Sequence, residues 1–254
     1  MPTRAALAAD LSNPSCRLAA AVHRVGGETR AALAADLGNQ SCRLTAAVHR
    51  VGGSLLLLAG GLGSRMWGEN KLYLKIAGAP LLSYLLPRLS PLFDETLLLA
   101  AKDGAREARQ RLGPLLNEWN VRVTEDRAAG RGPLEGLCRG LAAMSGEWGF
   151  LLGCDMPNVE EAVLRGMAAL RAEDTDVVAA EIGGYLEPLH AFYSRRCLPR
   201  AEAALAGSGR IKGFYRESRL TIAGEETLSR FSKSYKNSFT NLNTPGDFSL
   251  LMRS

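Results

Sequence analysis

The chain has 254 residues and a net charge of +5, with 46% hydrophobic and 22% charged residues, as in an ordinary globular protein. Its basic residues are scattered without a run of five or six, which favours a small anionic ligand over a nucleic acid. No apolar run reaches about 18 residues, so an ordinary membrane-spanning helix is excluded, and no secretory signal is recognisable. Since no two of the five cysteines form a C-x-x-C pair, we expect no zinc site. Their odd number and wide spacing indicate reduced thiols in a cytoplasmic protein.

Residues 4–27 and 30–53 are near copies that differ at three positions. Two copies are too few to bury the core of a repeat fold. We therefore expect residues 1–53 to be a duplicated extension of doubtful structure, attached to a domain at 54–254. The extension can be an appended arm for docking or oligomerisation. The alternative is a recent tandem duplication without function, or upstream sequence that is included because the start codon was misassigned. His23 and His49 fall inside it, which argues against histidine catalysis in the domain.

From residue 54 onward, apolar runs typical of buried strands alternate with segments of helical period. This alternation predicts an α/β fold with a largely parallel sheet covered on both faces, in which ligands bind at the carboxyl ends of the strands. The expected strands are Ser54–Ala59, Glu95–Ala101, Trp119–Thr124, Trp148–Gly153 and Asp176–Glu181, and the expected helices are Pro80–Leu89, Ala105–Leu116, Leu134–Met144 and Val159–Ala172.

The segment LAGGLGSRMWGENK, residues 58–71, follows the first expected strand. Its glycines let backbone N–H groups approach phosphates, while Arg65 and Lys71 add the positive charge that transferring phosphates need. It is not a P-loop, because no G-K-[ST] follows. We expect a phosphate cradle at Gly60 and Gly61, and the alternative is a plain turn from strand to helix.

Two acidic residues follow later strands. Asp155 comes after an apolar strand, and a lone carboxylate there suits a Mg²⁺ ligand, although an N-cap before Pro157 explains it equally well. Asp126 can hold a base or sugar, and the following segment GRGPLEG, residues 130–136, can close over a ligand; a solvated loop acid is the alternative.

Asn241 and Asn243 stand at i and i+2 near the C-terminus, so on an extended segment they face the same way. Their amides can hydrogen-bond a polar substrate. The alternative is a turn before a last helix, with Thr244 as its cap.

Together, these elements resemble the molybdenum cofactor guanylyltransferases, the MobA family. That family reads roughly LAGG-x-S-x-RMG-x-x-K, GxPL, GPLxG, C-D-x-P and N-x-NTP-x-[DE]. The counterparts occur here in the same order over about residues 54–254, with Gly63 in place of the loop serine and Trp67 inserted before Gly68. They are Leu58–Lys71, Gly78–Leu81, Gly132–Gly136, Cys154–Pro157 and Asn241–Asp247.

The resemblance implies a Rossmann-like, GT-A-like nucleotidyltransferase fold of three layers. It implies transfer of GMP from Mg-GTP to molybdopterin, and possible transient contact with molybdoenzymes or other proteins of cofactor biosynthesis. By position, GTP would be bound by Leu58, Ala59, Gly60, Gly61, Lys71, Asp126 and Asp155. Asp155 would also hold Mg²⁺, Arg65 would meet the phosphates, and Asn241 and Asn243 would bind the pterin substrate.

Two other functions stay open at this point. One keeps the fold but uses CTP, with molybdopterin or a sugar or alcohol phosphate as acceptor. The other is a non-catalytic carrier of the molybdenum cofactor, which would retain its ligand without releasing pyrophosphate. Against a carrier, Lys71 and Asp155 are both present, and a carrier needs no carboxylate to bind a metal.

Overall fold

The computed structural model describes residues 50–59, 65–66, 69–73, 75–76, 78–128 and 130–242. The described residues from Val51 onward belong to one compact unit, Val51–Ser254. The N–H groups of Val51 and Gly52 donate to the carbonyl oxygen of Leu92 at 2.7 and 3.1 Å. Contacts of this unit therefore start three residues before the expected boundary at 54. Residues 1–49 lie outside the described residues, so the expected extension stays a prediction.

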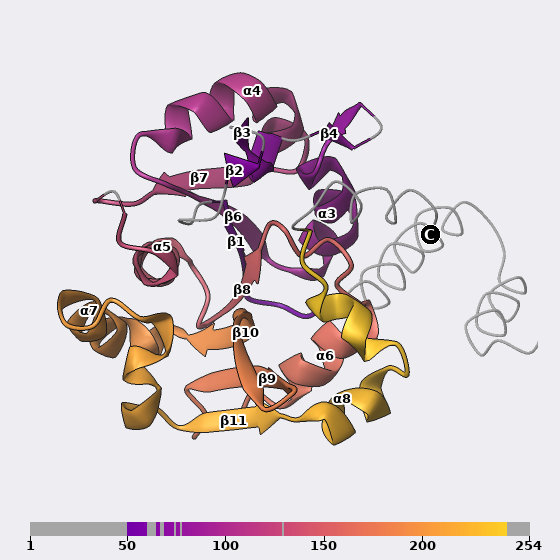
Figure 1. The fold of residues 1–254 in the computed structure, drawn as a ribbon, viewed down its shortest axis with the longest axis vertical. Coiled ribbons are helices and arrows are strands. Elements are labelled where there is room, and N and C mark those ends of the chain that lie inside the picture. The colour runs from indigo at the N-terminus through magenta and orange to yellow at the C-terminus, as the bar shows by residue number, and fades with distance from the viewer. Residues whose placement is uncertain are drawn as a thin grey trace, which may run out of the picture. The chain divides into compact units, whose positions relative to one another are not determined.

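A seven-stranded sheet forms the centre of the unit, in the order β11-β9-β10-β8-β1-β6-β7 (Figure 1). All of its strands run in one direction except β10, which is antiparallel to both of its neighbours. The prediction of an α/β fold with a mostly parallel sheet is thus confirmed. The strands are β1 (Ser54–Leu58), β6 (Glu95–Ala100), β7 (Val121–Glu125), β8 (Trp148–Gly153), β9 (Val177–Ile182), β10 (Tyr185–Ser194) and β11 (Leu220–Ala223).

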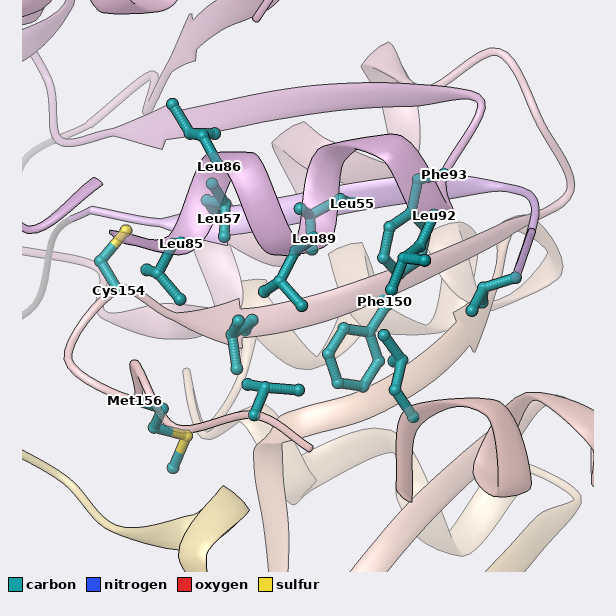
Figure 2. Packing of buried hydrophobic residues seen from close by; sticks show 14 of the residues in the cluster. Leu55, Leu57, Leu85, Leu86, Leu89, Leu92, Phe93, Phe150, Cys154 and Met156 are labelled. Atoms are coloured by element: carbon teal, nitrogen blue, oxygen red, sulfur yellow. The ribbon is translucent and has the colours of Figure 1, made fainter. Parts of the chain in front are cut away.

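The first strand, β1, shows why the sheet is covered on both faces. All five of its residues are buried, and successive side chains point to opposite faces. Leu55 and Leu57 pack in one hydrophobic cluster, together with leucines of α3 and Phe150 of β8 (Figure 2), whereas Leu56 and Leu58 pack in another. A continuous apolar strand of this kind requires a helical layer on each side.

The helices form these two layers. The cluster of Leu55 and Leu57 also contains buried residues of α3, α4, α6 and α8, and the cluster of Leu56 and Leu58 contains those of α5 and α7 (Figure 1). None of the described helices has the length and apolar composition that crossing a membrane requires. The helices are α3 (Leu82–Leu89), α4 (Gly104–Glu118), α5 (Pro133–Ala143), α6 (Glu161–Ala169), α7 (Leu198–Ala206) and α8 (Glu225–Phe231).

Shorter elements connect these layers. Two small antiparallel pairs precede α3, and short 3₁₀ helices occur along the chain. The pairs are β2 (Arg65–Met66) with β3 (Glu69–Asn70), and β4 (Lys75–Ile76) with β5 (Ala79–Pro80). The 3₁₀ turns are η2 (Lys71–Tyr73), η3 (Ser90–Leu92), η4 (Arg195–Cys197), η5 (Ile211–Glu217) and η6 (Tyr235–Phe239).

The structure differs from the predicted elements in the bounds of the third strand and in elements that were not predicted, which include α7, β11 and α8. The third strand begins at Val121 instead of Trp119, because α4 continues to Glu118 and Asn120 then turns with φ of 48°. The long strand β10 was not predicted. It returns from β9 through Gly183 and Gly184, whose φ angles of 59° and 80° match a hairpin turn that glycine favours.

One edge of the sheet is the strand β7, which pairs only with β6. Because the N–H of Asp126 donates to the carbonyl of Ala100, the backbone groups of alternate residues of β7 face outward. Two of these outward carbonyls are covered. Arg109 Nη2 donates to the carbonyl of Val123 at 3.2 Å, and Arg139 Nε donates to that of Glu125 at 3.3 Å.

Candidate functional site

β8, β1, β6 and β7 are parallel neighbours, so their carboxyl ends lie side by side. This line of strand ends is a common edge that runs across the strands, unlike the edge formed by the strand β7. Hydrogen bonds between the strands continue past their ends. The N–H of Ala59 donates to Leu99 at 3.0 Å, that of Cys154 to Leu58 at 3.1 Å and that of Asp126 to Ala100 at 3.0 Å. These bonds fix the backbone beside the four strand ends. They bring the expected site residues Leu58, Ala59, Asp126 and Asp155 to a common edge.

Asp155 lies two residues past the end of β8 and is half-buried. A Cβ atom at Gly153 would stand 2.7 Å from Asp155 Oδ1, so glycine leaves the room that this carboxylate occupies. The neighbouring Cys154 is buried, and burial raises the pKa of its thiol well above the usual range, which makes it a packing residue.

A magnesium ion suits the donor set at this strand end. Among the described residues, no three His, Cys, Asp or Glu side chains come together as a metal cluster. Mg²⁺ does not need one, because proteins commonly hold it through one or two carboxylates and the phosphates of the substrate. Asp155 therefore fits an ion that arrives with a phosphorylated ligand.

The C-terminal segment joins the site through Leu242, whose N–H donates to the carbonyl of Asp155 at 2.8 Å. The Leu242 side chain is buried against Leu81. Because Leu242 is bonded there, the preceding residue Asn241 lies beside the end of β8, and it is exposed to solvent. Asn243 lies outside the described residues.

The loop after β1 is described in part. Arg65 in β2 pairs with Asn70 in β3, and Lys71 begins η2. The next residues, Leu72 and Tyr73, are buried in the core, and this anchors the backbone of Lys71 to the domain. Gly60, Gly61 and the side chains of Arg65 and Lys71 lie outside the described residues, so their contacts with phosphates stay predictions.

Asp126 follows β7 and is half-buried. Burial, the nearby charge of Glu135 and that of Glu125 raise its pKa to about 7, against the opposing charge of Arg139. The helix α5 comes very close to this site, because a Cβ at Gly136 would stand 2.4 Å from Leu58 Cδ1. Such a carboxyl group can accept or donate a hydrogen bond near neutral pH.

The sequence did not single out Glu135. The segment GRGPLEG, residues 130–136, was expected to close over a ligand, and no function was given to its acid, although the expected helix Leu134–Met144 contains it. In the structure, Pro133–Ala143 is helix α5, and the Glu135 side chain is only 4% exposed. Its Oε1 accepts the N–H of Arg127 at 3.0 Å. The available signal was an acid in the first turn of a helix whose other residues, apart from Arg139, are uncharged.

The third histidine, His190, is a second buried polar group that the sequence did not single out. It lies in β10 with its ring centroid 5.0 Å from that of Phe150 and 4.5 Å from that of Phe239. Neither ring nitrogen has a hydrogen-bond partner in the described part of the chain, and burial lowers its pKa to about 3. A histidine inside the apolar run LHAFY was the available signal.

A three-layer α/β fold with a carboxylate at a strand end and a glycine-rich first loop is typical of a nucleotidyltransferase. The model of the MobA-like NTP transferase domain family matches residues 55–222. The chain belongs to this family, and it is an enzyme that transfers nucleotidyl groups. This sets aside the non-catalytic carrier.

Curated relatives cover most of the domain. A protein named molybdenum cofactor guanylyltransferase from Vibrio atlanticus is 30% identical over 193 residues, which is 76% of this chain and 91% of that protein. A protein of the same name from Aliivibrio fischeri strain MJ11 is 29% identical over the same lengths.

Solved structures share the fold. Molybdopterin-guanine dinucleotide biosynthesis protein A from Archaeoglobus fulgidus has a TM-score of 0.63 at 23% identity, over 79% of this chain and 100% of that one. The 4-diphosphocytidyl-2C-methyl-D-erythritol synthase of Anaerococcus prevotii has a TM-score of 0.54 at 16% identity, over 83% and 99%. At these identities, the similarity shows the fold alone.

Proposed function

We propose that this enzyme transfers GMP from Mg-GTP to molybdopterin, which yields the guanine dinucleotide form of the cofactor and pyrophosphate. The names of the curated relatives support these substrates. The observation that carries the proposal is the common edge of Asp126 and Asp155. Three strand spacings of about 4.8 Å separate their strands, so the strand backbones that carry the two acids lie about 14 Å apart on either side of β1 and β6.

This arrangement suits a nucleotide laid across the strand ends. The backbone of Leu58, Ala59, Gly60 and Gly61 approaches the ligand, and Asp126 binds the nucleoside part. Lys71 and Arg65 offset the charge on the phosphates. Asp155 holds Mg²⁺, which, when bound, neutralises charge on the phosphate oxygens.

The reaction is an in-line displacement. An oxygen of the molybdopterin phosphate attacks the α-phosphorus of GTP and forms the new P–O bond. The bond from the α-phosphorus to the bridging oxygen breaks, and its electron pair leaves with pyrophosphate. Because the attacking phosphate is already an anion, the chain needs no strong general base, and catalysis consists of positioning and charge neutralisation. Asn241 and Asn243 hold the pterin substrate on the side of Asp155.

A panel of nucleoside triphosphates with Mg²⁺ tests the choice of nucleotide. At 100 times its dissociation constant, a ligand stabilises the folded protein by about 2.7 kcal/mol, which raises the melting temperature of a protein of this size by roughly 5–10 °C. We expect this shift with Mg-GTP and not with ATP, CTP or UTP, and pyrophosphate release only when molybdopterin is added. A selective response to CTP would instead establish the cytidylyltransferase.

The remaining expectations belong to the same proposal. Cys138, Cys154 and Cys197 are free and buried, in keeping with a reducing compartment such as the cytoplasm. Because the product is a cofactor that other enzymes bind, we expect transient contact with molybdoenzymes or other proteins of cofactor biosynthesis.

Deleting residues 1–49 tests the repeated extension, and full activity of the shortened protein would exclude a catalytic role for it.

A further inference from the structure

Glu135 is an unusual residue for its place in the fold. It stands at the position that the family pattern GPLxG leaves open, in the first turn of α5, and only 4% of it is exposed. A carboxylate is rarely buried to this extent unless it is paired or hydrogen-bonded. The helix N-terminus favours its negative charge, but this alone does not require burial.

The contact that explains its burial leads directly to the nucleotide site. Glu135 Oε1 accepts the N–H of Arg127 at 3.0 Å, and Arg127 follows Asp126 in the chain. The same short turn is held from its other side by Lys102, whose Nζ donates to the carbonyl of Arg127 at 3.4 Å. The peptide that joins Asp126 to Arg127 is therefore fixed by Glu135, and so is the direction in which the Asp126 carboxylate leaves the backbone.

The charges around Asp126 come from two packed elements. Glu135 and Arg139 face it from α5, and Glu125 precedes it in β7. Burial and the two acids raise the pKa of Asp126 to about 7, while Arg139 opposes them. Both the protonated and the ionised form of Asp126 are consequently present near neutral pH, and Glu135 is the strongest of the charges that favour the protonated form.

We propose that Glu135 is a positioning residue that orients Asp126 toward the nucleotide and strengthens the dependence of nucleotide binding on the ionisation of Asp126. This rests on the proposed function. Sugar hydroxyls and the ring and amino N–H groups of guanine are hydrogen-bond donors, so they select the ionised carboxylate. The proton that Asp126 carries in the free protein is released to solvent when the nucleotide binds.

Two substitutions separate orientation from charge. Glu135→Gln keeps an oxygen that accepts the Arg127 N–H but removes the charge, and Glu135→Ala removes both. Glu118→Gln, at an exposed position at the end of α4, is the matched control for loss of one acid. The affinity of each protein for Mg-GTP is measured from pH 6 to pH 8. The ionisation of GTP is common to all of them, so the ratio to the wild type is compared at each pH.

For a pKa near 7 in the free protein, the ionisation of Asp126 alone should weaken binding roughly tenfold between pH 8 and pH 6 in the wild type and in Glu118→Gln, so their ratio should stay constant. Glu135→Gln should match the wild type at pH 8 and bind more tightly than the wild type at pH 6, because one charge that favours protonated Asp126 is removed. Glu135→Ala should bind roughly fivefold more weakly even at pH 8, because the Arg127 N–H loses its acceptor.

A Glu135→Gln profile identical to that of the wild type overturns the effect of Glu135 on the dependence on ionisation, and wild-type affinity of Glu135→Ala at pH 8 overturns the positioning role. In the ligand-free protein, the ¹³C resonance of the Asp126 carboxyl should titrate at a lower pH in Glu135→Gln than in the wild type. This measurement is independent of the nucleotide. If it succeeds while no variant binds GTP, the proposed function fails and the effect of Glu135 on Asp126 stands.

Discussion

The N–H of Leu242 donates to the carbonyl oxygen of Asp155 at 2.8 Å, and this bond joins two segments that are far apart in the sequence. It ties the residue expected to hold the metal to the segment expected to hold the acceptor substrate. Since the Leu242 side chain is also buried against Leu81, the position of Asn241 depends on both a backbone and a side-chain contact.

Replacing Leu242 tests this junction. Leu242→Pro removes the N–H, and a buried hydrogen bond contributes about 1 kcal/mol, so the KM for the acceptor should rise between about fivefold and tenfold. Leu242→Ala keeps the N–H and loses only the side chain, so it should lower stability with a smaller change in KM. Steady-state kinetics with both substrates measure the effect. Equal KM values in the two variants would contradict a role for the backbone bond.

Asp155→Asn should lower turnover about 100- to 1000-fold, because a neutral amide binds Mg²⁺ weakly and several kcal/mol of charge stabilisation are lost. The fold should persist, since the amide has the shape of the carboxylate. Pyrophosphate release and the melting temperature are the two measurements. Asp174→Asn, an exposed acid before β9, is the control and should retain wild-type turnover. Near-normal turnover of Asp155→Asn would exclude the metal role.

His190 should make the protein sensitive to acid. Its pKa is lowered to about 3 by burial, whereas an unfolded histidine titrates near 6.5, so the native state keeps it neutral. The stability that this histidine supports is complete above pH 6.5. Below that pH the unfolded state takes up a proton, and the free energy of unfolding should fall by about 1.4 kcal/mol per pH unit until the folded pKa is reached.

His190→Leu should therefore be less sensitive than the wild type between pH 6.5 and pH 4.5. It should also be more stable at pH 7, because two ring nitrogens without partners in the described part of the chain are removed. His190→Asn does not titrate but keeps a buried polar group, and it separates the two effects. Urea denaturation at several pH values provides the comparison. Parallel pH profiles of wild type and His190→Leu would refute the prediction.

Asp176 stabilises the sheet directly before the amino end of β9, away from the carboxyl ends that carry the candidate site. It is 2% exposed, accepts the N–H of Arg219 at 3.0 Å, and forms ion pairs with Arg200 at 2.9 Å and Arg219 at 3.1 Å. Burial alone would raise the pKa of this carboxyl group, but the hydrogen bonds and charges of the arginines lower it overall.

Asp176→Ala should lower the free energy of unfolding by about 3 kcal/mol at pH 7, because it leaves Arg200 without its acid. The pKa of Asp176 is lowered by folding, so its contribution is present above the unfolded value near 3.9 and is lost as the pH falls below it. The difference from the wild type should thus shrink in acid. Asp174→Ala, at an exposed acid two residues earlier, should change stability by less than about 0.5 kcal/mol.

Much of the fold follows from the sequence because its strands are short apolar runs between glycines and helical periods. Ser54–Leu58 and Trp148–Gly153 were predicted at or within one residue of their ends. The strand β10 was missed, since its proline, glutamate and histidine interrupt the alternation. Its Gly183-Gly184 turn was readable as a hairpin, and it accounts for the strand that runs against the others.

The site was predictable only as far as strand ends determine position. Asp126 and Asp155 follow apolar strands, so parallel pairing brings them to one edge. The buried state of Glu135 depends on how α5 packs against the neighbouring strand β7, and residue types alone do not encode this packing. For the same reason, nothing in the sequence indicated that Leu242 would bond to Asp155.

The guanidinium groups of Arg109 and Arg139 cover the outward carbonyls of Val123 and Glu125 on β7. A strand from another molecule would have to displace two charged side chains before it could extend the sheet, and it would meet like charge if it were basic. Exposed edges are the usual starting points of intermolecular sheet growth. The two arginines therefore hinder growth of the sheet along β7, whose carboxyl end is followed by Asp126.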